Sequence, residues 1–225
     1  MNVCRRWRQI VFGSPSRLNP QIICTYKTLT RKNIRIWPAF PIVLTLRCGT
    51  PSHEDNAIAA LEQSDRVCSV TLYLTGSLWE KMATVLRKPF PLLTRLKIYP
   101  TDLSALVLPD GFLGGSAPRL QEVFFHYIPF LSLSTLLSIN NNLVILTLSM
   151  IPSSTAYISP EAIAQCLAVL PNLESFTIEI RFATPQPVRI LPPPATRRVL
   201  PVLTSFYFEG AYDYLENLVI QIEPL

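Results

Sequence analysis

The side chains best suited to metal binding or nucleophilic catalysis in this chain are two histidines, His53 and His126, and five cysteines between Cys4 and Cys166. A zinc site needs three or four histidine, cysteine or carboxylate ligands, usually at close spacing. A Cys–His nucleophile needs both residues and an orienting group in one place. The sequence contains no such cluster, and neither GxxxxGK[ST] nor GxGxxG occurs. We therefore expect no metal, no cofactor and no enzymatic activity.

The cysteines also indicate the compartment in which the protein works. Their number is odd and no CxxC pair is present, which does not fit a small secreted scaffold held together by disulfides. No apolar run approaches the ~18–20 residues that a membrane helix requires. We expect a cytoplasmic or nuclear protein without a membrane partner.

The charges are distributed unevenly along the sequence. All nine basic residues before Glu54 occur without an acidic residue among them, whereas the remainder carries 11 basic and 15 acidic residues. A basic head can bind nucleic acid or an acidic protein, or can be a mitochondrial presequence. Here the basic residues alternate with apolar residues instead of forming one stripe, so we expect no nucleic acid as a partner.

One apolar spacing recurs through the chain, in which an apolar residue is followed by apolar residues three and five positions later. The triplets begin at Val67, Leu93, Leu120, Leu143, Leu173 and Leu203, which lie 26, 27, 23, 30 and 30 residues apart, and a weaker copy begins at Pro41. A period of this length is typical of a leucine-rich-repeat solenoid. We predict an α/β fold over residues 41–225: a right-handed horseshoe with a parallel sheet on its concave side and helices and loops on its convex side.

The segments between the triplets contain helix and turn signals. Proline stands two residues before four of the triplets, where it should end the preceding helix. Helix starts are predicted at Glu54, Ser159 and Asp213, and Ser77 with Glu80 forms a predicted capping box. Residues 184–201 are rich in proline and predict an extended loop in place of a helix, either an ordinary insertion or a docking peptide for a partner domain.

Alternate residues of each strand should point away from the apolar core, toward the concave side. These positions are basic in the early repeats and acidic in the late ones, with aromatic residues between them. The face is either simply solvated or a protein-binding site, and aromatic residues beside charges are typical of the second. The candidate protein-binding residues are Arg95, Lys97, Tyr99, Glu122, Phe124, His126 and Tyr207.

The head of the chain has an apolar stripe, formed by Val3, Cys4, Trp7 and Ile10, with basic residues between. This pattern predicts a short helix with one buried face. It resembles the last helix of an F-box, and with the repeats behind it the chain is similar to fungal F-box/leucine-rich-repeat proteins. The stretches 112–120 and 157–162 add to this resemblance. We assign residues 1–18 to the F-box remnant and residues 19–40 to a connecting segment.

The resemblance implies a substrate-recognition subunit of a cullin-type (SCF) ubiquitin ligase, with the F-box docked on the linker subunit and the repeats holding a protein substrate. The apolar-Pro-x-Glu-apolar stretch that opens an F-box does not precede this helix, so we expect residues 1–225 to dock weakly on the linker subunit. The alternative is a repeat scaffold with no ligase role. The asparagine that many leucine-rich repeats carry eight positions after the first triplet residue is also missing, which predicts an irregular horseshoe.

Overall fold

A computed structural model describes residues 5–13, 21–25, 30–36, 40–47, 50–102, 106–130, 136, 141–152, 158–181 and 198–224. Its helices are α1 (Arg5–Gly13), α3 (Thr30–Ile36), α4 (Pro51–Leu61), α5 (Gly76–Ala83), α7 (Pro160–Ala168) and α8 (Tyr212–Gln221), with short 3₁₀ helices η1 (Val85–Arg87) and η2 (Phe112–Gly115). Its strands are β1 (Ile22–Cys24), β2 (Ile42–Arg47), β3 (Val67–Leu74), β4 (Arg95–Pro100), β5 (Glu122–His126), β6 (Ile145–Pro152), β7 (Ser175–Arg181), β8 (Arg198–Leu200), β9 (Ser205–Glu209) and β10 (Ile222–Pro224).

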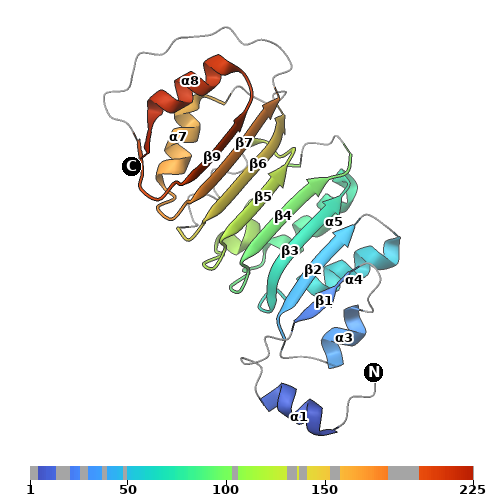
Figure 1. Ribbon diagram of the computed structural model, residues 1–225. Helices are drawn as coiled ribbons and strands as arrows, with labels where there is room; N and C mark the ends of the chain where they lie inside the picture. Colours follow the sequence, from blue (N-terminus) through green and yellow to red (C-terminus); the bar gives the residue numbers. More distant parts are fainter. Residues whose placement is uncertain are drawn as a thin grey trace.

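Eight strands form one open parallel sheet in the order β1-β2-β3-β4-β5-β6-β7-β9 (Figure 1). The seven strands from β2 onward lie at the seven apolar triplets, and equivalent triplet residues pair across the sheet. The middle residues of six triplets form one such row, which runs Val70, Leu96, Val123, Leu146, Phe176 and Phe206. The predicted parallel pairing is therefore confirmed. The sequence analysis did not predict β1, which adds an eighth strand beside β2.

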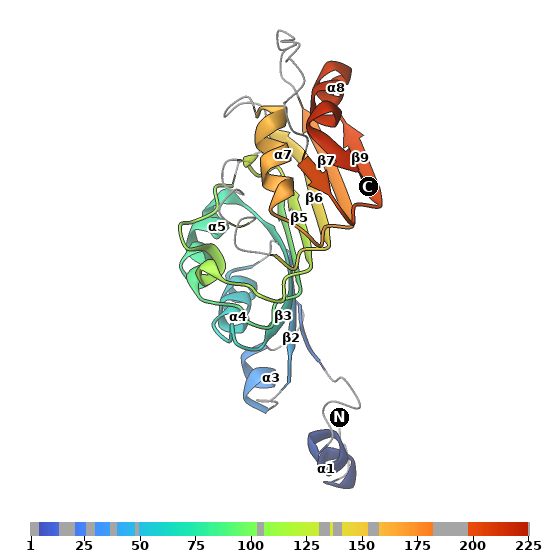
Figure 2. The ribbon, with the colours of Figure 1, turned by 90° about the vertical axis from the view of Figure 1, so that its left-hand side faces the viewer.

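The apolar residues of the triplets point to the face of the sheet that carries the helices. Helices α4, α5 and α7 cover this face, as the edge-on view shows (Figure 2). The triplet residues of β3 to β7 are buried, whereas Phe206 and Phe208 on β9 are only partly buried because β9 is the last strand of the sheet. Period-two alternation in a strand thus directs one set of side chains into the core and leaves the other set on the opposite face.

The four prolines before the triplets lie in tight turns. The N–H of the first triplet residue donates to the carbonyl three positions back in each turn, as from Leu93 to Phe90 at 3.2 Å and from Leu120 to Ala117 at 3.0 Å. Proline therefore occupies the second position of each turn, where its fixed φ is favourable. Pro91, Pro118 and Pro171 follow the ends of η1, η2 and α7, as predicted, whereas Pro201 follows the strand β8 instead of a helix. All four prolines also shape the turn that starts the next strand.

Of the predicted helix starts, only the one at Ser159 is placed correctly. Helix α4 begins at Pro51 instead of Glu54, and α8 begins at Tyr212 with Ala211 as its N-cap instead of Asp213. Helix α7 begins after Ser159, whose hydroxyl accepts a hydrogen bond from the N–H of Ala162 at 3.2 Å, as expected for an N-cap. The capping box predicted at Ser77 is wrong, because α5 begins at Gly76 and Thr75 occupies the N-cap position. Ser77 is thus the second residue of the helix and lies within its first turn.

Two other predicted segments contain more regular structure than expected. The connecting segment 19–40 includes β1 and α3. The end of the predicted loop 184–201 forms β8, which pairs in parallel with β10 after α8, while residues 184–197 lie outside the described part of the chain. Short strands such as these depend on partners far away in the sequence, which a local pattern cannot reveal.

Candidate protein-binding face

The face of the sheet opposite the helices is called the open face here. It carries the alternate residues Arg47 (β2), Ser69, Thr71 and Tyr73 (β3), Arg95, Lys97 and Tyr99 (β4), Glu122, Phe124 and His126 (β5), Ile145, Thr147 and Ser149 (β6), Ser175, Thr177 and Glu179 (β7), and Ser205, Tyr207 and Glu209 (β9). Six of the seven predicted binding residues lie together on β4 and β5. The seventh, Tyr207, shares the face but lies beyond β6 and β7.

Aromatic rings form a continuous stack across three strands of the open face. The ring of Tyr99 lies parallel to that of Tyr73, with centroids 4.5 Å apart, and against that of Phe124, at 4.7 Å. The guanidinium of Arg47 lies over the outer side of Tyr73, 5.1 Å from the ring centroid. Stacking of this kind fixes ring positions and leaves partly exposed apolar surface, which suits protein recognition.

The basic residues of β4 are partly neutralised by Glu122 on β5. The Nζ of Lys97 lies 2.5 Å and the Nε of Arg95 lies 3.6 Å from carboxylate oxygens of Glu122. Because all three side chains reach solvent, these ion pairs contribute little to stability. They hold the side chains in place and leave one net positive charge at this position. Burial, the neighbouring Tyr73 and the charge of Glu122 together raise the pKa of Tyr99.

His126, Ser149 and Glu179 form a polar chain across β5, β6 and β7. The Ser149 hydroxyl donates a hydrogen bond to the Glu179 carboxylate, and Nδ1 of His126 lies 3.3 Å from the same hydroxyl. In a hydrolase triad the histidine accepts the serine proton and the acid orients the histidine. Here the serine lies between the other two residues and donates to the acid. These hydrogen bonds therefore position Glu179 instead of activating Ser149.

The backbone beside this polar chain is strained. Tyr127 and Met150, which directly follow His126 and Ser149, have φ values of 54° and 56°. The β6–β7 pairing also shifts register between Leu148 and Ile151, as a bulge does. Positive φ costs free energy for a residue with a side chain and recurs at functional sites. This feature could not be predicted from the sequence, because neither position is a glycine.

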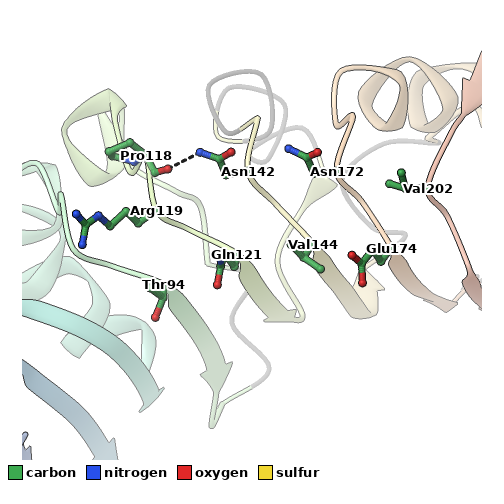
Figure 3. A pocket seen from close by; sticks show the side chains of 9 residues that line it. All are labelled: Thr94, Pro118, Arg119, Gln121, Asn142, Val144, Asn172, Glu174 and Val202. Carbon is green, nitrogen blue, oxygen red and sulfur yellow. Dashed lines mark hydrogen bonds between the residues drawn. The ribbon is translucent and has the colours of Figure 1, made fainter. Parts of the chain in front are cut away.

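A second surface feature lies at the edge of the sheet where the strands begin. A groove of about 460 Å³ is lined by Thr94, Pro118, Arg119, Gln121, Asn142, Val144, Asn172, Glu174 and Val202 (Figure 3). Asn142 donates through Nδ2 to the carbonyl of Pro118 at 2.7 Å, and Asn172 donates to the carbonyl of Asn141 at 2.8 Å. These amides join consecutive turns, so their first role is structural. Sequence reasoning missed them because it looked for asparagine eight residues after each triplet begins, whereas these stand one residue before.

The predicted F-box residues are only partly within the described structure. Helix α1 forms as expected and lies beyond the β1 end of the sheet (Figure 1). The Ile10 side chain is 52% exposed, which contradicts its place on a buried stripe. Val3 and Cys4, and the side chain of Trp7, fall outside the described residues.

Within the described parts of the chain, no three histidine, cysteine, aspartate or glutamate side chains group as a metal site would require. Burial raises the pKa of the Cys68 and Cys166 thiols, which lowers the fraction of reactive thiolate. Of the helices described, none combines the length and the apolar character needed to span a bilayer.

Comparison of the sequence with protein-family models and with curated proteins gave no match.

Proposed function

We propose that the chain is a protein-interaction module whose open face binds a protein partner. The observation that carries this proposal is the stack of Arg47, Tyr73, Tyr99 and Phe124, which places rigid, partly exposed rings beside fixed charges. Aromatic residues and arginine are enriched in the energetically important parts of protein interfaces. The proposal assigns binding to this chain and no catalytic step.

The finer architecture that we propose is a leucine-rich-repeat solenoid with the open face on its concave side. The regular period of the triplets and the parallel pairing of each strand with the next support this proposal. Hydrogen bonds between equivalent positions of consecutive repeats also support it. Thr94 Oγ1 donates to the carbonyl of Cys68 at 2.9 Å, and Thr204 Oγ1 donates to that of Glu174 at 3.1 Å. Each repeat in a solenoid contacts mainly its neighbours.

On the resemblance of its head and repeats, we further propose that the chain is a substrate-recognition subunit of a cullin-type ubiquitin ligase. The alternative is a repeat scaffold that binds its partner without a ligase. A calorimetric titration of the chain with the linker subunit separates the two. Submicromolar binding would support the ligase role and contradict the expectation of weak docking, whereas no detectable binding would favour the scaffold.

The open-face proposal is tested separately by capture of interacting proteins on the immobilised chain. The test variant is Tyr99→Ala with Phe124→Ala, which removes the centre of the stack. The matched control is Glu80→Ala, which changes an exposed side chain on α5, away from the open face. A partner retained by wild type and the Glu80 variant but lost by the stack variant supports the proposal; equal retention by all three contradicts it.

A further inference from the structure

The charges on the open face are separated along the sheet. Arg47, Arg95 and Lys97 lie on β2 and β4, whereas Glu179 and Glu209 lie on β7 and β9. Between them, Glu122 on β5 pairs with the two cations of β4. Among the described side chains, the face is thus positive at one end and negative at the other, with aromatic and apolar residues at its centre.

The positive end is held by ring contacts. Arg47 lies over Tyr73, and Tyr73 stacks in turn on Tyr99. A cation over a ring is attracted to the π-electron face, and the contact restricts the rotamers of the long side chain. An arginine fixed in this way loses less conformational entropy when it pairs with a carboxylate of a partner.

The negative end is held by hydroxyl groups. The Ser149 hydroxyl donates to the Glu179 carboxylate, and the Tyr207 hydroxyl donates to that of Glu209 at 3.2 Å. Glu179 is half-buried and Glu209 exposed, so each can still reach a cation of a partner. The strained backbone at Met150 and the bulge of β6 lie beside the serine that fixes Glu179. The fold therefore preorganises an anion at this end as well.

We propose that the open face binds an extended dipolar protein segment, with its acidic end over β2–β4 and its basic end over β7–β9. This inference rests on the proposed function and specifies the chemistry and polarity of the partner. Neighbouring strands lie ~4.8 Å apart, so the five spacings from Arg47 to Glu179 cover about 24 Å. At ~3.3 Å per residue, that distance matches about seven extended residues, and Glu209 extends it to about nine. The centre of the segment should be apolar, because over β5 and β6 it meets the partly exposed Phe124 and the exposed Ile145.

A nucleic acid is a poor match for this face. Its backbone carries negative charge along its whole length. It would pair with Arg47 and Arg95 but would place phosphates against Glu179 and Glu209. The separation of charge therefore favours a protein segment, and a nucleic acid becomes an outcome of the test.

The experiment uses peptides of about nine residues with blocked termini, so that only side chains carry charge. The dipolar peptide has aspartates at one end, leucine and serine in the middle and lysines at the other end. Two controls replace all charged positions with aspartate or with lysine, and single-stranded DNA of similar length is a third. Binding to the full chain is measured by fluorescence anisotropy at low salt.

We expect the dipolar peptide to bind about fivefold more tightly than either uniformly charged peptide, because each control loses its attractive pairs at one end. In the double variant Glu179→Lys/Glu209→Lys, the all-aspartate peptide should become the preferred one. The matched control Glu80→Lys/Asp213→Lys makes the same change in net charge at exposed sites on α5 and α8 and should keep the wild-type ranking. Added salt should reduce all these differences.

Equal affinity for the three peptides, tighter binding of DNA, an unchanged ranking in the Glu179/Glu209 variant, or no binding up to about 1 mM would each overturn the inference. Far-ultraviolet circular dichroism of every variant ensures that a lost preference does not reflect unfolding. These outcomes are distinct from failure of the proposed function. A chain that loses its captured protein on stack mutation, yet shows no peptide polarity, would retain the binding role and lose only the dipolar partner.

Discussion

The side chain of Asn142 donates a hydrogen bond to the carbonyl of Pro118 in the preceding turn, at 2.7 Å (Figure 3). Asn172 makes the equivalent bond to Asn141, one repeat later. Both asparagines stand one residue before the first apolar residue of a triplet, so the bonds lie at equivalent places in consecutive turns. They join consecutive turns along the end of the sheet where the strands begin. The sequence analysis predicted no such link in this part of the repeat.

Replacement of Asn142 by alanine should lower the free energy of unfolding by about 0.5–1.5 kcal/mol, the usual contribution of one hydrogen bond. Gln121→Ala, at an exposed position lining the same groove, should change it by less than about 0.5 kcal/mol. Urea unfolding of both variants measures the difference. Equal losses would mean that the asparagine bond between the turns contributes nothing of its own.

Leu146 lies on β6 in the middle of the sheet and is 1% exposed. Its replacement by alanine should leave a cavity and cost about 2–5 kcal/mol. Thr147 on the same strand points to the open face, and Thr147→Ala should cost no more than about 0.5 kcal/mol. Thermal unfolding compares the two, and similar shifts in Tm would contradict the alternation of buried and open-face residues.

The repeating strands could be predicted because each carries the same local pattern. Leu143, Leu146 and Leu148 bury one face of β6, and the spacing alone identifies that face. The grouping of Arg95, Lys97, Tyr99 and Phe124 followed from the same alternation, because parallel strands in register bring equivalent positions side by side. What could be predicted is thus what the period of the sequence determines.

The missed features depend on contacts that no period encodes. The strand β1 has only three residues and exists through its pairing with β2. The bulge at Ser149 places Met150 at positive φ without a glycine to mark it. Helix α5 begins at Gly76, with Thr75 and not Ser77 at the N-cap position. Serine and threonine have similar preferences for this position, so the local sequence does not decide between them. In each case tertiary context decides between local options.

Reversing both charges of β4, with Arg95→Glu and Lys97→Glu, should weaken binding of the protein partner, mainly at low salt. Exposed charges attract a partner over a range that salt shortens to about 10 Å at 0.1 M. The two new carboxylates would also lie beside Glu122, which now pairs with both cations. We expect the loss to shrink as ionic strength rises, measured by surface plasmon resonance at several salt concentrations.

The control for this charge reversal is Arg87→Glu/Lys88→Glu, two exposed cations at the end of η1 on the helix-bearing side. It changes the net charge by the same amount but leaves the open face intact. If this control weakens binding as much as the β4 variant, the effect comes from total charge and not from the open face.

Tyr99 should make the protein less stable at alkaline pH. Burial, Tyr73 and Glu122 raise its pKa in the folded state. Above the usual tyrosine value of about 10, the unfolded chain loses this proton while the folded chain keeps it, so the unfolded state binds fewer protons and stability falls as pH rises toward the folded-state pKa. Below about pH 9 this contribution is constant. Tyr99→Phe keeps the ring that stacks on Tyr73 and Phe124 but cannot ionise.

The free energy of unfolding of wild type and Tyr99→Phe, measured with urea near pH 8 and again near pH 11, tests this linkage. Near pH 8 the two should agree within about 1 kcal/mol, since at most one hydroxyl hydrogen bond is lost. Between the two pH values the wild type should lose more stability than the variant. Other tyrosines with raised pKa, such as Tyr207 beside Glu209, are present in both proteins and cancel in the comparison. Equal losses would show that Tyr99 ionises as readily in the folded sheet as in the unfolded chain, and that its position between Tyr73 and Glu122 does not disfavour its anion.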